Sequence, residues 1–184
     1  MKKTVIIFIA VIAVLLIIPI SSHNSLVSSR EDVNQKAATI DVYLKKRADS
    51  IGSLLATVNG YASHEKEIID SVTSARENLA GAHTTAEKAQ ANDAASAAIS
   101  GMMVIVENYP DIKADANFRQ FADEFTGTEN RIAVARIDYN NAVSVYNKKI
   151  ITLPGSLIAS MMGLEKAEYF EATEAEKEAP KIEF

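Results

Sequence analysis

The sequence predicts an all-α protein, with an N-terminal single transmembrane helix followed by an antiparallel up-and-down four-helix bundle. Residues 5–20 form an unbroken apolar run. Four later segments repeat apolar residues at alternating steps of three and four, which places them on one face of a helix. Short polar breaks separate these segments, which favours antiparallel neighbours. We therefore expect a transmembrane anchor in residues 1–22, a bundle in 23–163 and an acidic tail in 164–184.

Residues 4–20 are predicted to contact membrane lipid. These 17 residues are at the short end of the ~17–25 that cross a bilayer as a helix. A cleaved secretory signal peptide is the alternative, because Lys2 and Lys3 precede the run. The run is longer than the ~7–15 residues of a signal core, and no A-x-A site follows it, so a retained anchor is favoured.

The cations around the run predict its orientation. Lys2 and Lys3 lie before it, whereas Arg30 and Lys36 are the first cations after it. The positive-inside rule then places the N-terminus in the cytoplasm and the helical domain outside it.

The first three bundle helices follow from their apolar positions. The first has apolar residues at Val33, Ala37, Ile40, Leu44, Ala48, Ile51, Leu55 and Val58. The second has Ile68 or Ile69, Val72, Ala75 and Leu79, and the third has Ala91, Ala95, Ala98, Met102 and Ile105. We expect a break at Gly60, a cap at Ser63 and a turn at 81–85. The third helix should end near Tyr109, because Pro110 disfavours helical geometry in the residue before it.

The last long segment has the most regular pattern. Its 3-4 repeat comprises Phe118, Phe121, Phe125, Thr128, Ile132, Ala135, Tyr139, Ala142, Tyr146 and Lys149. Asp115 or Asn117 can cap the helix, and residues 153–155 should end it. At 1.5 Å per residue its length is roughly 50 Å. We expect the first and last helices to be the longest.

The tail is acidic. From Glu165 onward it contains seven Glu and three Lys, and its −4 makes up most of the net charge of −5. Such a density of like charge predicts a mobile segment. Tyr169-Phe170 and residues 182–184 are apolar exceptions that could dock.

Charge and composition exclude several kinds of function. No cluster of Lys and Arg is present to bind a phosphate backbone, so nucleic-acid binding is not expected. The chain has no cysteine, which excludes disulfides, thiolate metal sites and a cysteine nucleophile.

The histidines do not form a recognised catalytic pattern. His64-Glu65 begins a zinc-protease motif, but Ile68 occupies the position of the second histidine. A di-iron site needs Glu three residues before His, and His23, His64 and His83 have none there. P-loop, dinucleotide and G-x-S-x-G motifs are also missing. We expect no enzyme activity and no cofactor.

One group of polar residues is the candidate site. It comprises Arg47, Asp49, Glu129, Arg131, Arg136 and Asp138. Arg131 and Arg136 flank the apolar stripe, where interhelical ion pairs commonly set the register. The other interpretation is a ligand-binding groove built on Arg47, Glu129, Arg131 and Arg136.

The same segments carry a family resemblance. KKRADSI ends one matching string, and TENRIAVARIDYNNAVSVYN forms another. The matching strings cover residues 26–51, 58–68, 107–118, 128–147, 153–163 and 179–184. Over nearly its full length the chain resembles the LemA family. Gly52, Ser53 and Leu164 depart from the family pattern.

The resemblance implies a membrane-anchored helical bundle of bacteria, and it implies no established enzyme activity. We expect the inner membrane, with the helical domain on the periplasmic or extracellular side. The expected function is a membrane-anchored scaffold or protein-interaction domain. The alternative is a small-ligand-binding module or enzyme accessory that uses the polar group.

Self-association and contacts with other membrane or envelope proteins are the expected partnerships. The two longest helices should leave parts of their apolar stripes without a partner inside the chain. The candidate positions are Val33, Ala37, Ile40, Tyr146 and Ile150. Exposed apolar stripes of this kind commonly mark interaction surfaces.

Overall fold

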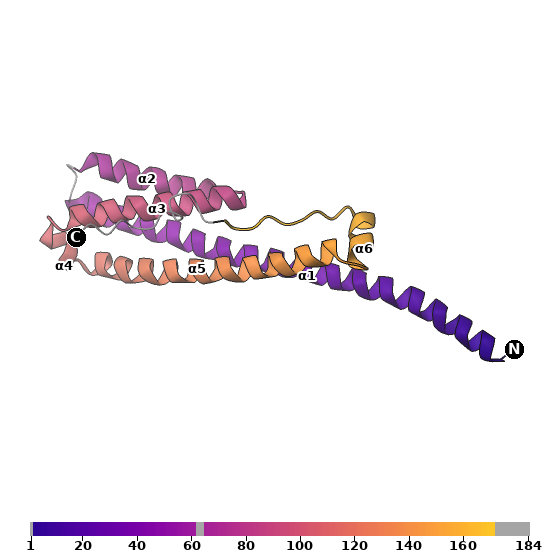
Figure 1. Cartoon of the computed structure of the whole chain (residues 1–184). Coiled ribbons are helices and arrows are strands. Elements are labelled where there is room, and N and C mark those ends of the chain that lie inside the picture. The colour runs from indigo at the N-terminus through magenta and orange to yellow at the C-terminus, as the bar shows by residue number, and fades with distance from the viewer. Residues whose placement is uncertain (1, 62–64, 172–184) are drawn as a thin grey trace, which may run out of the picture. The chain divides into compact units, whose positions relative to one another are not determined.

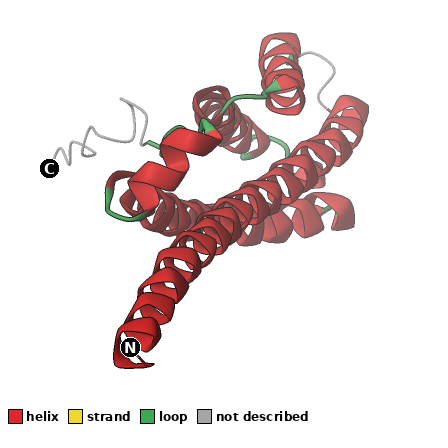
Figure 2. Cartoon of the chain, turned by 90° about the vertical axis from the view of Figure 1, so that its right-hand side faces the viewer, coloured by secondary structure: helices red, strands yellow, loops and turns green. Residues whose placement is uncertain are grey.

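The structure, a computed structural model, describes residues 2–61 and 65–171, without the side chains of residues 2 and 9–16 (Figure 1). Its helices are α1 Lys2–Tyr61, α2 Lys66–Gly81, α3 Thr85–Val106, α4 Pro110–Ala114, α5 Ala116–Ile151 and α6 Gly155–Met162. Within these described ranges there are helices and loops but no strand (Figure 2). The all-α class is confirmed.

The predicted anchor and the first bundle helix form one continuous helix. α1 contains 60 residues and passes through Pro19 and Gly52 without interruption. It ends at Tyr61, one residue beyond the expected break at Gly60. Among the residues whose side chains are described, no helix is both long and apolar enough to span a bilayer. The side chains of residues 9–16 in the predicted anchor lie outside that set.

The chain divides into two compact units, and α1 and α5 contribute to both. The first unit comprises Met1–Ala37 and Asp138–Tyr169, and the second comprises Ala38–Ile137 and Phe170–Phe184. The division falls after Ala37 within α1 and after Ile137 within α5, so each of these helices contributes to both units. We call them the hairpin unit and the four-helix unit.

The four-helix unit contains parts of α1 and α5 together with α2, α3 and the short α4. α2 and α3 pack side by side (Figure 1). Its buried apolar residues include Ile40, Leu44, Ala48, Ile51, Leu55, Val58, Val72, Ala75, Leu79, Ala91, Ala95, Met102, Phe118, Phe121, Ile132 and Ala135. These residues confirm most of the predicted stripes. In α3, however, Ile99 and Val106 are buried, whereas Ala98 and Ile105 are only half-buried.

The ends of these helices are largely where the turn and cap residues predict them. Thr84 forms a capping box with Glu87 at the start of α3. Pro110 ends the preceding turn and also starts α4, a helix that the sequence pattern did not predict. The Asp115 carboxylate accepts hydrogen bonds from two backbone N–H groups of the first turn of α5, which confirms it as the cap. The expected cap Ser63 lies outside the described residues.

The hairpin unit pairs the early part of α1 with the late part of α5. The Lys36 ammonium lies 3.6 Å from the Asp138 carboxylate. Closer to the N-terminus of α1 and to the C-terminus of α5, the Lys149 ammonium donates to the Ser25 carbonyl at 3.1 Å. Residue numbers rise along one helix as they fall along the other, so the two helices are antiparallel.

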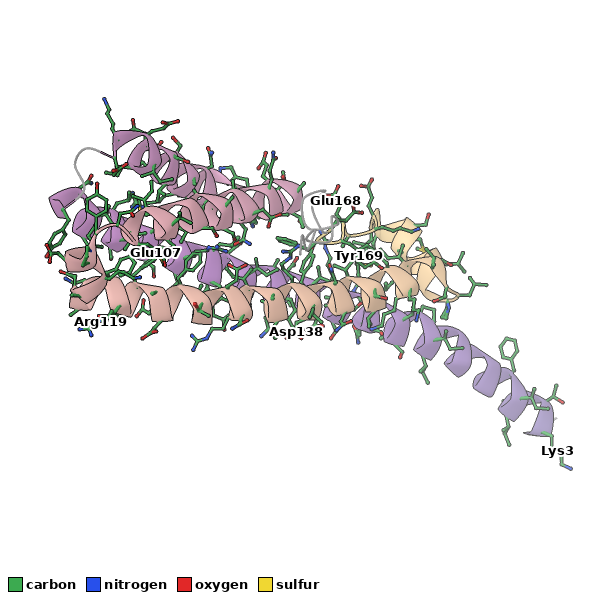
Figure 3. All side chains as sticks on the ribbon, turned by 60° about the vertical axis from the view of Figure 1, so that its left-hand side comes forward. Lys3, Glu107, Arg119, Asp138, Glu168 and Tyr169 are labelled. Carbon is green, nitrogen blue, oxygen red and sulfur yellow. The ribbon has the colours of Figure 1, made fainter. Side chains whose placement is uncertain are left out.

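An extended segment, residues 164–169, completes the hairpin unit. The Tyr146 hydroxyl donates to the Glu165 carbonyl at 3.1 Å, and the Tyr139 hydroxyl donates to the Glu168 carbonyl at 2.9 Å. Figure 3 labels Asp138 on α5, and Glu168 and Tyr169 on this segment. The expectation of mobility from Glu165 onward is therefore wrong for this part, because side chains of α5 hold its backbone.

Candidate functional site

Arg47 is the buried charged residue at the centre of the candidate site. Its place on α1 follows from the helical repeat, three residues after Leu44 and four before Ile51, both of which are buried. The Arg47 side chain is itself only 1% exposed. A guanidinium on the core face of a helix must find its partners within the protein, because burial without them is costly.

Helix α3 supplies two of these partners. The Arg47 Nη1 donates to the Asn92 side-chain oxygen, and its Nη2 donates to the Ser96 hydroxyl at 2.7 Å. Asn92 is itself buried. Asn92 and Ser96 are four residues apart, so they lie on one face of α3 and meet the same guanidinium.

Helix α5 supplies the countercharge and a stacking surface. The Glu129 carboxylate forms an ion pair with Arg47 Nη1. The Arg47 guanidinium carbon lies 4.6 Å from the ring centroid of Phe125, which is within the range of a cation–π contact. Glu129 and Phe125 are also four residues apart on one helix face. Arg47 thus connects three helices of the four-helix unit.

Burial and charge act on Arg47 in opposite directions. Burial is the larger influence and lowers the pKa of Arg47, while the negative charges of Glu129 and Asp93 raise it. An arginine nevertheless stays protonated in proteins. Arg47 Nε is buried without a hydrogen bond to the described part of the chain, whereas Glu129 Oε2 is the oxygen that pairs with Arg47 Nη1. The network therefore holds a permanent charge with most, but not all, of its donors satisfied.

The other four predicted site residues do not join this network. Asp49 pairs with Lys45 at 3.3 Å along an exposed face of α1. Arg131 is exposed on α5. Asp138 belongs to the hairpin unit and pairs with Lys36. Of the six predicted site residues, only Arg47 and Glu129 therefore contact each other in one network.

Arg136 has a different role in the four-helix unit. Its guanidinium carbon lies 4.6 Å from the ring centroid of Phe170, and its Nη2 donates to the Glu171 carbonyl at 3.3 Å. Phe170 is buried. The expected docking is confirmed for Phe170, which Arg136 contacts, but not for Tyr169, which is exposed. Residues 182–184 lie outside the described residues.

Three residues of the Arg47 network were missed at the sequence level. Asn92, Ser96 and Phe125 are its contacts on α3 and α5. Two features of the sequence could have indicated this network. Asn92 is a polar residue next to the Ala91–Ala95 stripe, and Arg47 interrupts the apolar face of the first helix. Phe125 was predicted as core, and it is half-buried.

A charged groove of about 700 Å³ lies elsewhere in the four-helix unit, among α1, α2 and the start of α3. Its charged lining residues are Asp41, Lys45, Asp49, Arg76, Glu77 and Lys88. Four of these form two ion pairs, because the Lys88 ammonium contacts the Asp41 carboxylate and the Lys45 ammonium contacts the Asp49 carboxylate. Arg76 donates to the Ala48 carbonyl at 3.1 Å. Arg47 does not line this groove.

Possible metal ligands do not gather in the described part of the molecule. Among those residues, no three His, Asp or Glu side chains are placed to hold an ion. His64, which begins the incomplete protease motif, lies outside them. His83 lines the charged groove.

Comparison with known proteins gives several relatives of similar length or longer. Magnetosome protein MamQ 2 of Paramagnetospirillum magneticum is 26% identical over 175 residues, which cover 81% of this chain and 64% of that protein. Protein LemA of Metamycoplasma hominis is 23% identical over 171 residues, covering 92% and 78%. Magnetosome protein MamQ of Magnetospirillum gryphiswaldense is 23% identical over 174 residues, covering 80% and 64%. The chain therefore spans less than two thirds of the length of these magnetosome proteins.

A family model described as the LemA family matches residues 36–184. The match includes Arg47 and all of its partners, together with α2 to α6 and the extended segment. It covers well over half of the 184 residues. The chain belongs to the LemA family.

Proposed function

We propose that this chain is a membrane-anchored helical scaffold, or protein-interaction domain, without catalytic activity. The Arg47 network carries the proposal. The Arg47 guanidinium is buried, and its contacts are with Asn92, Ser96, Glu129 and Phe125, all within the four-helix unit. A charge used in this way sets the register of helices.

The same geometry disfavours the alternative of a ligand groove built on the predicted residues. A ligand site needs convergent polar groups that face an open cavity. Arg47 is buried, whereas Arg131 is exposed. Arg136 faces Phe170 instead. Of the four residues, only Arg47 and Glu129 meet.

The anchor in the proposal is supported by residues 4–20 and by helix continuity. The backbone is helical from Lys2 through the apolar run and onward to Tyr61. A rigid helix of this kind would connect a bilayer to the rest of the chain without a flexible linker. Lys2 and Lys3 favour a cytoplasmic N-terminus, with the other domain beyond the inner membrane.

Self-association stays a prediction, and the positions first chosen for it no longer support it. Val33, Ile40 and Tyr146 are buried by the chain's own residues, and Ala37 and Ile150 are half-buried. What remains is the effect of tethering, because confinement to a membrane raises the effective concentration of one copy near another.

The anchor is tested by washing membranes with alkaline carbonate. The full-length chain should stay in the membrane fraction with its N-terminal residues intact, and a variant without residues 4–20 should be released. A mature chain that begins near Ser21 would overturn the anchor. For orientation, Ser156→Cys should react with an impermeant maleimide in cells whose outer barrier is open, since the chain has no other cysteine. Labelling only after lysis would reverse the orientation.

The scaffold role is tested with a variant that removes the buried charge but keeps the volume. Arg47→Met/Glu129→Gln should fold, because an apolar replacement of a buried ion pair is often tolerated. We expect proteins cross-linked to the wild type in native membranes to be cross-linked equally to this variant. Arg131→Ala, an exposed change on the same helix as Glu129, is the matched control. A folded double variant that loses these contacts, or loses binding of a small molecule, would favour the ligand-binding alternative.

A further inference from the structure

The turn after α5 and the helix α6 form an uncharged corner of the hairpin unit. Residues 150–164 contain no charged side chain, although Lys148, Lys149, Glu165 and Lys166 flank them directly. Four large apolar side chains of this stretch are strongly exposed: Ile151, Leu153, Leu157 and Met161. Met161 reaches 84% exposure. We call these four residues the α6 corner.

α6 packs in the opposite sense to an ordinary amphipathic helix. Its buried residues are Gly155 and Ala159, the small ones. A Cβ added at Gly155 would lie 2.2 Å from the Lys149 carbonyl oxygen, so α6 approaches the end of α5 as closely as glycine allows. An ordinary amphipathic helix buries its large apolar residues instead. Here Leu157 and Met161 face outward while the small face makes the internal contact.

The outward position of these side chains is fixed by the backbone. The Ser156 N–H donates to the Thr152 carbonyl at 2.8 Å, which ties the start of α6 to the turn. At the other end Gly163 has a φ of 62°, in the left-handed region that favours glycine. The Leu164 N–H donates to the Ala159 carbonyl at 2.9 Å and closes the cap. The exposure of the corner is thus built into a capped helix.

The corner lies beside the end of the predicted anchor, within the same unit. Leu153, Pro154 and Gly155 line one cavity of about 390 Å³ together with Ile17, Ile18 and Ser21 of α1. Ile17 and Ile18 are themselves exposed. Exposed apolar side chains of the predicted anchor, Ile17 and Ile18, and of the α6 corner, Leu153, thus border one cavity. Ser22, Ser25, Thr152 and Lys149 also line it.

We propose that the α6 corner binds the surface of the lipid bilayer, next to the point where α1 enters it. A helix of this kind lies at the boundary of headgroups and acyl chains, with its apolar side chains inserted. Lys148, exposed in the last turn of α5, would lie near anionic headgroups. The anchor holds the corner at the membrane, so a small apolar surface is sufficient. This inference rests on the proposed membrane anchor.

The experiment is a depth measurement on the full-length protein in vesicles of phosphatidylcholine and phosphatidylglycerol. Single cysteines, Phe8→Cys, Met161→Cys and Val104→Cys, carry a nitroxide spin label. All three positions are exposed. Collisions with oxygen report lipid, and collisions with a water-soluble nickel complex report solvent. Val104 on α3 is the matched control, since it is an exposed apolar residue in the four-helix unit.

The inference expects the labels at Phe8 and Met161 to be oxygen-accessible and protected from nickel, by about tenfold relative to the label at Val104. A label at Met161 with the same nickel accessibility as Val104, while Phe8 is in lipid, would overturn the inference and leave the anchor standing. If Phe8 is also in water, the proposed anchor itself fails. Protection at Met161 from both reagents, with spin–spin broadening that disappears on dilution with unlabelled protein, would show instead that a second copy covers the corner.

Discussion

The four-helix unit and the hairpin unit use the same two long helices but bury their surfaces differently. In the four-helix unit, α2 and α3 cover the apolar face of α1, and the one arginine on that face receives Asn92 and Ser96 as partners. In the hairpin unit, no further long helix is available, and an extended segment lies against α5. The side chains of Tyr139, Tyr146 and Asn147 hold that segment by its backbone.

The difference shows two ways of completing one amphipathic helix. A packed helix forms its backbone hydrogen bonds internally, so it contacts its neighbour through side chains alone. These side chains can include ones that neutralise a buried charge. An extended segment brings unsatisfied N–H and C=O groups, so the helix must offer polar side chains to them. The large residues of the α5 stripe accordingly change from Phe and Ile in the four-helix unit to Tyr139 and Tyr146 in the hairpin unit, and Asn147 follows Tyr146 directly.

The largest expected effect comes from removing apolar volume in the four-helix unit. Ile132→Ala should lower the free energy of unfolding by roughly 2–5 kcal/mol, because Ile132 is fully buried. Val134→Ala, an exposed position on the same helix, should change it by less than about 0.5 kcal/mol. Chemical denaturation measures both. Equal small effects would mean that this face of α5 is not a core.

Breaking the ion pair should have the next largest effect. Glu129→Ala leaves Arg47 buried without its ion-pair partner, and we expect a loss of about 3 kcal/mol, the lower end for buried pairs. Water can reach the Glu129 side chain, which is 44% exposed, and this limits the loss. The double variant Arg47→Met/Glu129→Ala should recover most of the stability. A double variant that is less stable than Glu129→Ala would contradict a purely structural role for the pair.

The extended segment depends on Asn147 in the hairpin unit. Its side chain donates to the Ala167 carbonyl and accepts from the Ala167 N–H, both at 2.9 Å. Asn147→Ala removes both bonds and should cost about 1–3 kcal/mol. Limited proteolysis with trypsin should then cleave faster after Lys166. Asn141→Ala, an exposed change on the same helix, should leave the rate unchanged, and equal rates for the two variants would show that Asn147 does not hold the segment.

The smallest expected effect is pH-dependent and concerns the capping box of α3. Hydrogen bonds from the backbone N–H groups of Thr84 and His83 lower the pKa of Glu87 below its ordinary value. The stabilisation is therefore complete above the ordinary glutamate pKa and is lost as the pH falls through the lower, folded-state pKa. The stability difference between the wild type and Glu87→Ala should shrink as the pH is lowered from 7 to about 3. A difference that grows in acid would have the wrong sign.

Periodicity and caps made much of the fold predictable from the sequence. All ten stripe positions of α5, from Phe118 to Lys149, are buried or half-buried because the 3-4 repeat fixes one face of a helix. Asp115 and Pro110 marked boundaries through local backbone chemistry that needs no tertiary partner. α6 was missed, because its large residues face outward and its internal face is made of glycine and alanine.

The candidate site was less predictable, since it depends on register between helices. Arg47 and Glu129 were expected together, and they meet. The sequence of one protein does not show which residues of α3 lie opposite Arg47 in the packed helices, so Asn92 and Ser96 were missed. The extended segment was missed for a related reason. Its contacts use its backbone, while its composition, rich in glutamate, predicts a solvated chain.

Hydrogen exchange of two variants, followed by mass spectrometry, tests most directly the claim that each unit relies on its own polar contacts. Glu129→Ala should speed exchange in α3 and in residues 116–137 of α5, and leave residues 164–169 as in the wild type. Asn147→Ala should speed exchange in residues 164–169 and leave α3 and residues 116–137 as in the wild type. This crossed pattern follows because the Arg47 network joins helices of one unit, and Asn147 holds the segment of the other. Exchange that rises equally in both regions for either variant, or in neither region for Glu129→Ala, would contradict the account.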